Sequence, residues 1–132
     1  MEEGAYGYIK DLPGVSFEEA RNRVTEALGE EGFGVLTTIE VDATLKKKLD
    51  VDFKPYVILG ACNPVLAHRA LEAEPQIGLL LPCNVVVEAA GDGSRVMVIK
   101  PRAMFQVVDN PALEPIAQEA DDRLRRALEK LS

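Results

Sequence analysis

The chain has 132 residues, of which 47% are hydrophobic and 28% charged, a composition typical of a folded domain and not of a disordered segment. Fifteen basic residues stand against 22 acidic ones, which gives a net charge of −7. Because an acidic surface repels phosphate groups, we expect neither a nucleic-acid partner nor an anionic membrane partner. This length accommodates one core, so residues 1–132 are expected to form a single domain.

Few features of the chain point to a compartment. Its two cysteines, Cys62 and Cys83, are too few and too far apart to indicate a disulfide framework. The chain begins without a basic segment followed by an apolar one, so no secretory signal is expected. We therefore predict a cytoplasmic protein with reduced thiols. Its seven Asn and Gln residues are a low number, which is a feature of some thermophilic proteins.

The first half of the chain predicts two strands and two helices. Residues 6–10 form a short candidate strand, and a helix is expected to follow because Ser16 and Glu19 have the spacing of a capping box. Alternation over residues 33–41 predicts the second strand. Asp42 is expected to cap a short helix. Three consecutive lysines near its end are more typical of a solvated helix terminus than of an anion site.

The second half begins with a nearly continuous apolar run over residues 55–62, which predicts a strand buried on both faces. Asn63 and Pro64 are typical N-cap and first-turn residues, so a helix is expected directly after this strand. Its apolar side chains would be Val65, Ala67 and Leu71.

A hairpin and a long helix are expected to complete the chain. Valine-rich segments at 85–88 and 96–99 flank a Gly-Asp-Gly-Ser turn. Helical spacing of apolar residues up to Leu131 predicts a C-terminal helix that begins at Asn110-Pro111 or at Glu114-Pro115. The predicted fold class is therefore α+β, with the order β-α-β-α-β-α-β-β-α and a single mixed β-sheet packed with helices. Because the hairpin strands alternate little, either helices or a second copy in a homodimer should cover their second face.

Two short segments contain four of the candidate ligand-binding residues: Ala61-Cys62-Asn63-Pro64 and Pro82-Cys83-Asn84. Each places a thiol beside an Asn and a Pro at the edge of an apolar strand. Cys62 precedes a helix start, where unpaired backbone N–H groups favour an anion or a thiolate. Cysteine is also among the most buried residue types, so for each thiol taken alone an inert core position is the favoured interpretation.

His68 is the only histidine, and it could meet Cys62 and Cys83 around a soft metal such as zinc or copper. The spacing matches no metal-ligand motif, so we expect neither a bound metal nor another cofactor. No catalytic motif or nucleotide-binding loop is present, and the sequence favours a protein that is not an enzyme. Glu88 lies within an apolar strand and is either an outward-facing side chain or a buried site residue.

The chain resembles a small prokaryotic family, domain of unknown function 302. The resemblance rests on a Gly-Phe-Gly-Val-Leu-Thr segment at 32–37, on the segment from Tyr56 to Pro64, on the helix around His68, and on residues 78–85. It implies an α+β domain, a homodimer, and no established activity or catalytic residue.

These features favour a cytoplasmic homodimeric module that binds a small ligand or regulates another process, with Cys62, Asn63, His68, Cys83 and Asn84 as its candidate site. A thiol-based redox, sulfur-handling or soft-metal protein that uses Cys62, His68 and Cys83 is the alternative. An interaction domain with two inert thiols is a third possibility.

Overall fold

Apolar strands build one six-stranded sheet, which the computed structural model describes together with its helices for all residues 1–132. The spatial order of the strands is β1-β2-β6-β5-β4-β3, and every neighbouring pair is antiparallel. The strands are β1 (Glu2–Glu3), β2 (Gly7–Leu12), β3 (Gly34–Glu40), β4 (Tyr56–Cys62), β5 (Cys83–Ala90) and β6 (Gly93–Ile99).

The predicted α+β class, the single sheet and the order of its main elements are confirmed, but the sheet is antiparallel and not mixed. Strands β2 and β3 run in the same direction, yet three strands lie between them, so the crossover between them creates no parallel pair. The connections from β3 to β4 and from β4 to β5 each join neighbouring strands at one end of the sheet, which makes those pairs antiparallel.

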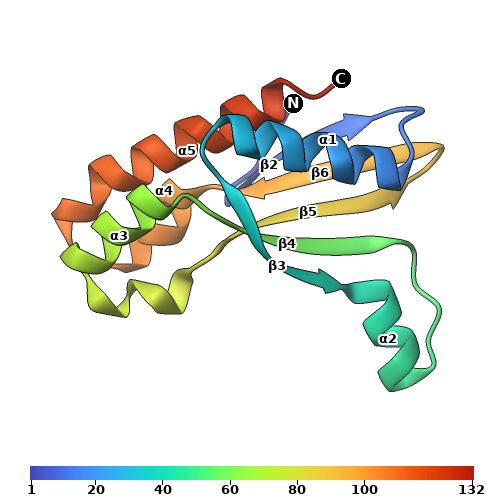
Figure 1. The fold of residues 1–132 in the computed structure, drawn as a ribbon, viewed down its shortest axis with the longest axis horizontal. Coiled ribbons are helices and arrows are strands. Elements are labelled where there is room, and N and C mark those ends of the chain that lie inside the picture. The colour runs from blue at the N-terminus through green and yellow to red at the C-terminus, as the bar shows by residue number, and fades with distance from the viewer.

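Two long helices cover one face of the sheet (Figure 1). Below them, alternate strand residues such as Val57, Leu59, Val85 and Val96 are fully buried. Residues that point to the opposite face, such as Ile58, remain partly exposed. The helices are α1 (Phe17–Glu30), α2 (Val41–Leu49), α3 (Pro64–Ala73), α4 (Pro101–Met104) and α5 (Glu114–Glu129), with 3₁₀ segments η1 (Pro75–Leu80), η2 (Phe105–Val107) and η3 (Pro111–Leu113).

The helix starts agree with the sequence in part. Ser16 Oγ accepts a hydrogen bond from Glu19 N at 3.1 Å, as the capping box predicts. Helix α5 begins at Glu114, the second of the two predicted starts. Asp42 does not cap α2; its carboxylate accepts instead from Tyr56 N at 3.4 Å, and α2 begins without a side-chain cap.

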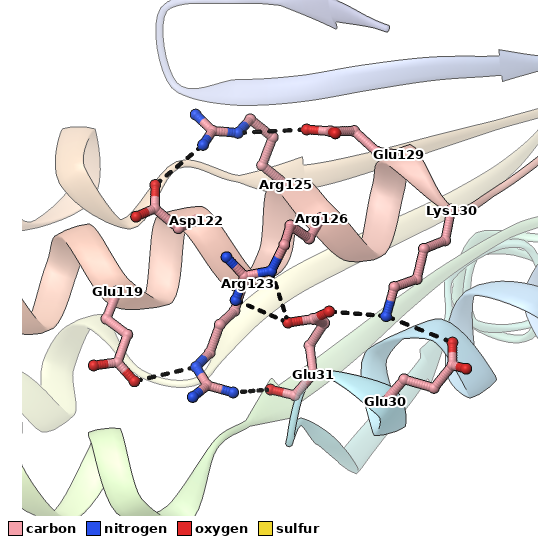
Figure 2. Close-up of polar contacts among 9 residues, drawn as sticks. All are labelled: Glu30, Glu31, Glu119, Asp122, Arg123, Arg125, Arg126, Glu129 and Lys130. Atoms are coloured by element: carbon pink, nitrogen blue, oxygen red, sulfur yellow. Dashed lines mark hydrogen bonds and ion pairs between the residues drawn. The ribbon is translucent and has the colours of Figure 1, made fainter.

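Polar contacts tie α5 to its surroundings. The buried hydroxyl of Tyr8 on β2 donates to Asp121 Oδ1 of α5 at 2.5 Å. Near the C-terminal end of α5, Glu31 after α1 contacts Arg126 of this helix and Lys130 just after it at 3.1 and 2.8 Å (Figure 2). No helix of the protein has both the length and the apolar character needed to cross a membrane.

Candidate functional site

The two cysteine-containing segments meet where two neighbouring strands of the sheet have their ends. Strand β4 ends at Cys62, and β5 begins at Cys83. Because the two strands are antiparallel neighbours, Ala61 and Cys83 are direct register partners. The sequence prediction that both segments lie at strand ends is therefore correct, and the fold also makes those two ends adjacent.

A pocket of about 310 Å³ opens at this edge. Thirteen of its sixteen lining residues are hydrophobic, and none of them is charged. The sheet contributes Ala61 and Cys83, while α3 and α5 form walls with small side chains at Ala67, Ala70 and Ala120. These alanines leave volume that larger side chains would fill. Such an apolar hollow with few polar groups is typical of small-molecule sites.

Asn63 joins β4 to α3 beside the pocket. Its Oδ1 accepts from Leu66 N at 3.2 Å, so the amide group caps the helix as the sequence predicts. The side chain is 9% exposed, and its Nδ2 lies 2.9 Å from the place where a Cβ on Gly32 would stand. Gly32 has φ +83°, so a glycine both adopts this backbone and lets the Asn63 amide approach closely.

Both thiols favour the protonated state. Burial raises the pKa of Cys83 to about 12, and the neighbouring Cys62 adds to that rise. Burial also raises the pKa of the half-buried Cys62 thiol. This direction is opposite to the thiolate that the helix start was expected to favour. Leu66 N and Ala67 N are already bonded to Asn63 and Pro64 has no N–H, so Val65 carries the remaining N–H of the first turn.

Two of the five candidate residues lie outside the pocket. His68 points to solvent, and its Nε2 lies 2.9 Å from Glu72 Oε1 one turn along α3. Asn84 is exposed, because its side chain alternates with those of Cys83 and Val85 and points to the opposite face of β5. Cys62, His68 and Cys83 do not converge. No group of three or more His, Cys, Asp or Glu side chains is arranged to hold a metal ion.

Glu88 is the remaining candidate, and it is buried on the face of the sheet away from the long helices. Its Oε1 lies 3.3 Å from Lys54 Nζ and 3.4 Å from Arg95 Nη1. The side chain thus points outward from the helix-covered core, as one of the two interpretations holds, although its neighbours shield it from solvent.

A second and larger hollow of about 860 Å³ lies over α4, η2, η3 and the start of α5. Its lining is mostly polar and includes exposed side chains such as Gln106, Glu114 and Gln118. The apolar pocket is the better candidate site, because most of its lining residues are buried side chains held by the core, although Leu36 and Leu71 at its rim are exposed.

Much of the pocket lining was not among the candidate site residues that the sequence predicts. Phe33, Phe105 and Ile116 reach it from segments far apart in the chain. On α3 the buried residues are Leu66 and Ala70, whereas Val65 and Leu71 of the predicted apolar face are exposed. The four-residue spacing of Leu66 and Ala70 is the signal that identifies this face.

Comparison with known proteins agrees with the resemblance noted in the sequence. The model of the family "Domain of unknown function DUF302" matches residues 8–131. The chain is also similar to the crystal structure of an uncharacterized conserved DUF302 protein from Bacillus stearothermophilus. The two share 34% identity and a TM-score of 0.87 over 96% of this chain and 98% of that one. No curated protein matches the chain.

Proposed function

The chain belongs to the DUF302 family, for which no activity is established, and on that premise we propose that it binds a small, uncharged, mainly apolar molecule. The pocket between β4, β5, α3 and α5 is the proposed site. The observation that carries the proposal is its lining, which is almost wholly hydrophobic and contains no charged side chain. A charged ligand would lose its hydration there without gaining a partner.

Binding without catalysis fits the chemistry of this pocket. No carboxylate, histidine or lysine lines it, so it offers no general acid or base near neutral pH. The raised pKa values of Cys62 and Cys83 leave both thiols protonated there, and a protonated thiol is a poor nucleophile. A ligand-binding or regulatory role is therefore favoured over the thiol-based alternative. Two free thiols also support the proposal of a cytoplasmic location.

Regulation could act through the elements that meet at the pocket. A bound molecule would contact α3, α5 and the start of β3 at once, because all three line the same volume. A ligand that binds only the folded state also stabilises that state by mass action. The proposal thus predicts a higher thermal midpoint whenever the pocket is occupied.

The test uses N-phenyl-1-naphthylamine, an uncharged dye that fluoresces in apolar surroundings. We expect saturable binding of one dye per chain, with a rise in the thermal midpoint. Ala67→Phe places a ring in the pocket at a half-buried position and should weaken dye binding at least tenfold. Ala112→Phe, at an exposed position outside this pocket, is the matched control and should bind as the wild type does. Absence of saturable binding, or equal binding by a folded Ala67→Phe variant, would contradict the proposal.

A further inference from the structure

The sheet face away from α1 and α5 carries an apolar row that crosses five strands. Register pairing joins Ile9 to Met97, Met97 to Val86, Val86 to Ile58, and Ile58 to Ile39. These five side chains share one face because each stands directly opposite the next. All remain at least partly exposed, and Ile39 is 49% exposed. A solvated sheet face normally carries polar side chains at such positions.

A charged row runs beside the apolar one. Asp11, Arg95, Glu88 and Tyr56 are successive register partners on β2, β6, β5 and β4. Within the chain, Arg95 Nε lies 2.7 Å from Asp11 Oδ1, and Arg95 Nη1 lies 3.4 Å from Glu88 Oε1. Lys54 Nζ also lies 3.3 Å from the same Glu88 Oε1. The hydrogen bonds of the row involve Nε and Nη1 of Arg95 and Oε1 of Glu88, which leaves Nη2 of Arg95 and Oε2 of Glu88 without a hydrogen bond inside the chain.

We propose that a second copy of the chain packs on this face, about a twofold axis that runs along the strands between β5 and β6. The strand order β1-β2-β6-β5-β4-β3 has its midpoint there, so the rotation places β6 over β5 of the partner and β2 over β4 of the partner. The apolar residues on β2, β6, β5 and β4 then face each other, while Ile39 on β3 lies opposite Glu2 of the partner subunit, because Glu2 is the register partner of Ile9 on β1. This proposal does not depend on ligand binding in the pocket.

Charge complementarity favours a second copy over an unrelated partner. Under this rotation Arg95 lies opposite Glu88 of the partner subunit, and Glu88 lies opposite Arg95 of the partner subunit. Asp11 likewise lies opposite the hydroxyl-bearing Tyr56 of the partner subunit. The charged row is thus its own complement, which is the condition for an isologous interface.

The available area also agrees with a dimer. The four strands β2, β6, β5 and β4 overlap fully under this rotation, and strands about 4.8 Å apart and about seven residues long give a face of about 19 by 24 Å, or about 460 Å². A stable interface needs about 800 Å² on each partner. The remainder is present in the segment that follows β3, where Leu49, Val51 and Phe53 are exposed. The Phe53 ring packs edge-on against that of Tyr56, with centroids 6.0 Å apart, and so extends the same face.

Light scattering after gel filtration tests the assembly. The wild type should have twice the 14.4 kDa mass of one chain at micromolar concentration. Met97→Lys places a charge in the middle of the apolar row and should give a folded monomer. Leu79→Lys is the control, because Leu79 is 85% exposed in η1, outside this face, and should leave the dimer intact. A monomeric wild type, or a dimeric Met97→Lys variant, would overturn the proposal.

A charge exchange tests the facing of Arg95 and Glu88. Glu88→Arg alone and Arg95→Glu alone each set like charges against each other across the axis, so each variant should be monomeric. An equimolar mixture should regain the dimer mass, because one chain then carries two positive charges and the other two negative ones. Contacts within a single chain cannot produce this recovery. A mixture that stays monomeric, or single variants that both remain dimers, would overturn the proposed twofold arrangement.

Discussion

Single glycines fix how closely the strands approach their neighbours. Gly93 begins β6, and a Cβ at this position would lie 2.3 Å from Leu12 O and 2.7 Å from Gly14 N. Both contacts are with backbone atoms, which cannot move aside as a flexible side chain can. The absence of a side chain at Gly93 therefore lets the β5–β6 hairpin pack against the end of β2.

Gly93→Ala should lower the free energy of unfolding by about 1–3 kcal/mol, the usual cost of forcing extra atoms into a packed site. Gly78→Ala is the control, since a Cβ there has no neighbour within 4 Å and the backbone has no positive φ. It should change the stability by less than about 0.5 kcal/mol. Urea unfolding followed by circular dichroism measures both values. Equal stability of the two variants would show that the backbone at Gly93 relaxes freely.

The two thiols should differ in reactivity from each other and from an ordinary cysteine. A pKa of about 12 and almost complete burial should keep Cys83 unlabelled by iodoacetamide from pH 5 to 9 until the protein unfolds. Cys62 is half-buried with a raised pKa, so its labelling should be slow and should rise only above the usual thiol range. Mass spectrometry assigns each adduct. Rapid labelling of Cys62 below pH 7 would contradict this and would revive a thiol-based function.

Local patterns could identify part of the site at this scale. A cysteine followed by an Asn-Pro N-cap pair marks a strand-to-helix corner, and the structure has that corner. The sequence could not show that burial would raise the pKa of Cys62, because that depends on the side chains that pack around it. Nor could it place Phe105 and Ile116 in the pocket, since they arrive through long-range packing.

Ion pairs at the contact between α1 and α5 show how one helix supplies the basic residues that the other lacks. Helix α1 has no basic residue in its last turn, although a cation there would interact favourably with the negative end of the helix dipole. The C-terminal end of α5 supplies them: Arg126 in the helix and Lys130 just after it both contact the buried Glu31 carboxylate (Figure 2). The hydrogen bond from Lys130 is the main cause that holds the pKa of Glu31 below its ordinary value, and Arg126 adds to it.

Glu31→Gln should therefore cost about 1 kcal/mol at pH 7, a modest amount because Arg126 and Lys130 remain about half exposed. The folded state lowers this pKa, so the contribution is present above the unfolded value of about 4.3 and is lost as the pH falls through the folded value. Wild type and variant should then converge in stability at acidic pH. Thermal unfolding from pH 3 to 7 measures the difference, with the more exposed Glu30→Gln as the control. A difference that does not shrink between pH 7 and pH 3 would contradict this account.

Element identity was more predictable than element pairing. Ser16, Asn63 and the glycine turn at 91–94 act locally, so each predicted element has a counterpart in the structure. The direction of each strand depends instead on which strands become neighbours. That choice is made by long-range packing, and it separates β2 from β3 and leaves the sheet without a parallel pair. The β1 strand of two residues has too short a pattern to predict.

At the scale of the whole molecule, the sheet has two unlike faces. One is closed by α1 and α5, and most of its strand residues are buried. The other holds the apolar row from Ile9 to Ile39 without a helix above it. The lack of polar alternation in the hairpin could be seen in the sequence. Only the three-dimensional register shows that these residues form one continuous row.

A dimer through this face predicts that thermal stability depends on protein concentration. Folded dimer and unfolded chains are then linked by mass action, so the midpoint rises as the protein is concentrated. With about 0.7 kcal/mol of unfolding enthalpy per residue, two chains give about 185 kcal/mol, and a hundredfold increase in concentration raises the midpoint by about 5 °C. Calorimetry from about 5 to 500 μM measures this shift.

The Met97→Lys monomer should show a constant midpoint, and Leu79→Lys should follow the wild type. Aggregation acts in the opposite direction, since it removes unfolded chains and lowers the apparent midpoint at high concentration. A wild-type midpoint that is constant over this range, while light scattering reports one chain, would leave the apolar face solvated and the protein a monomer.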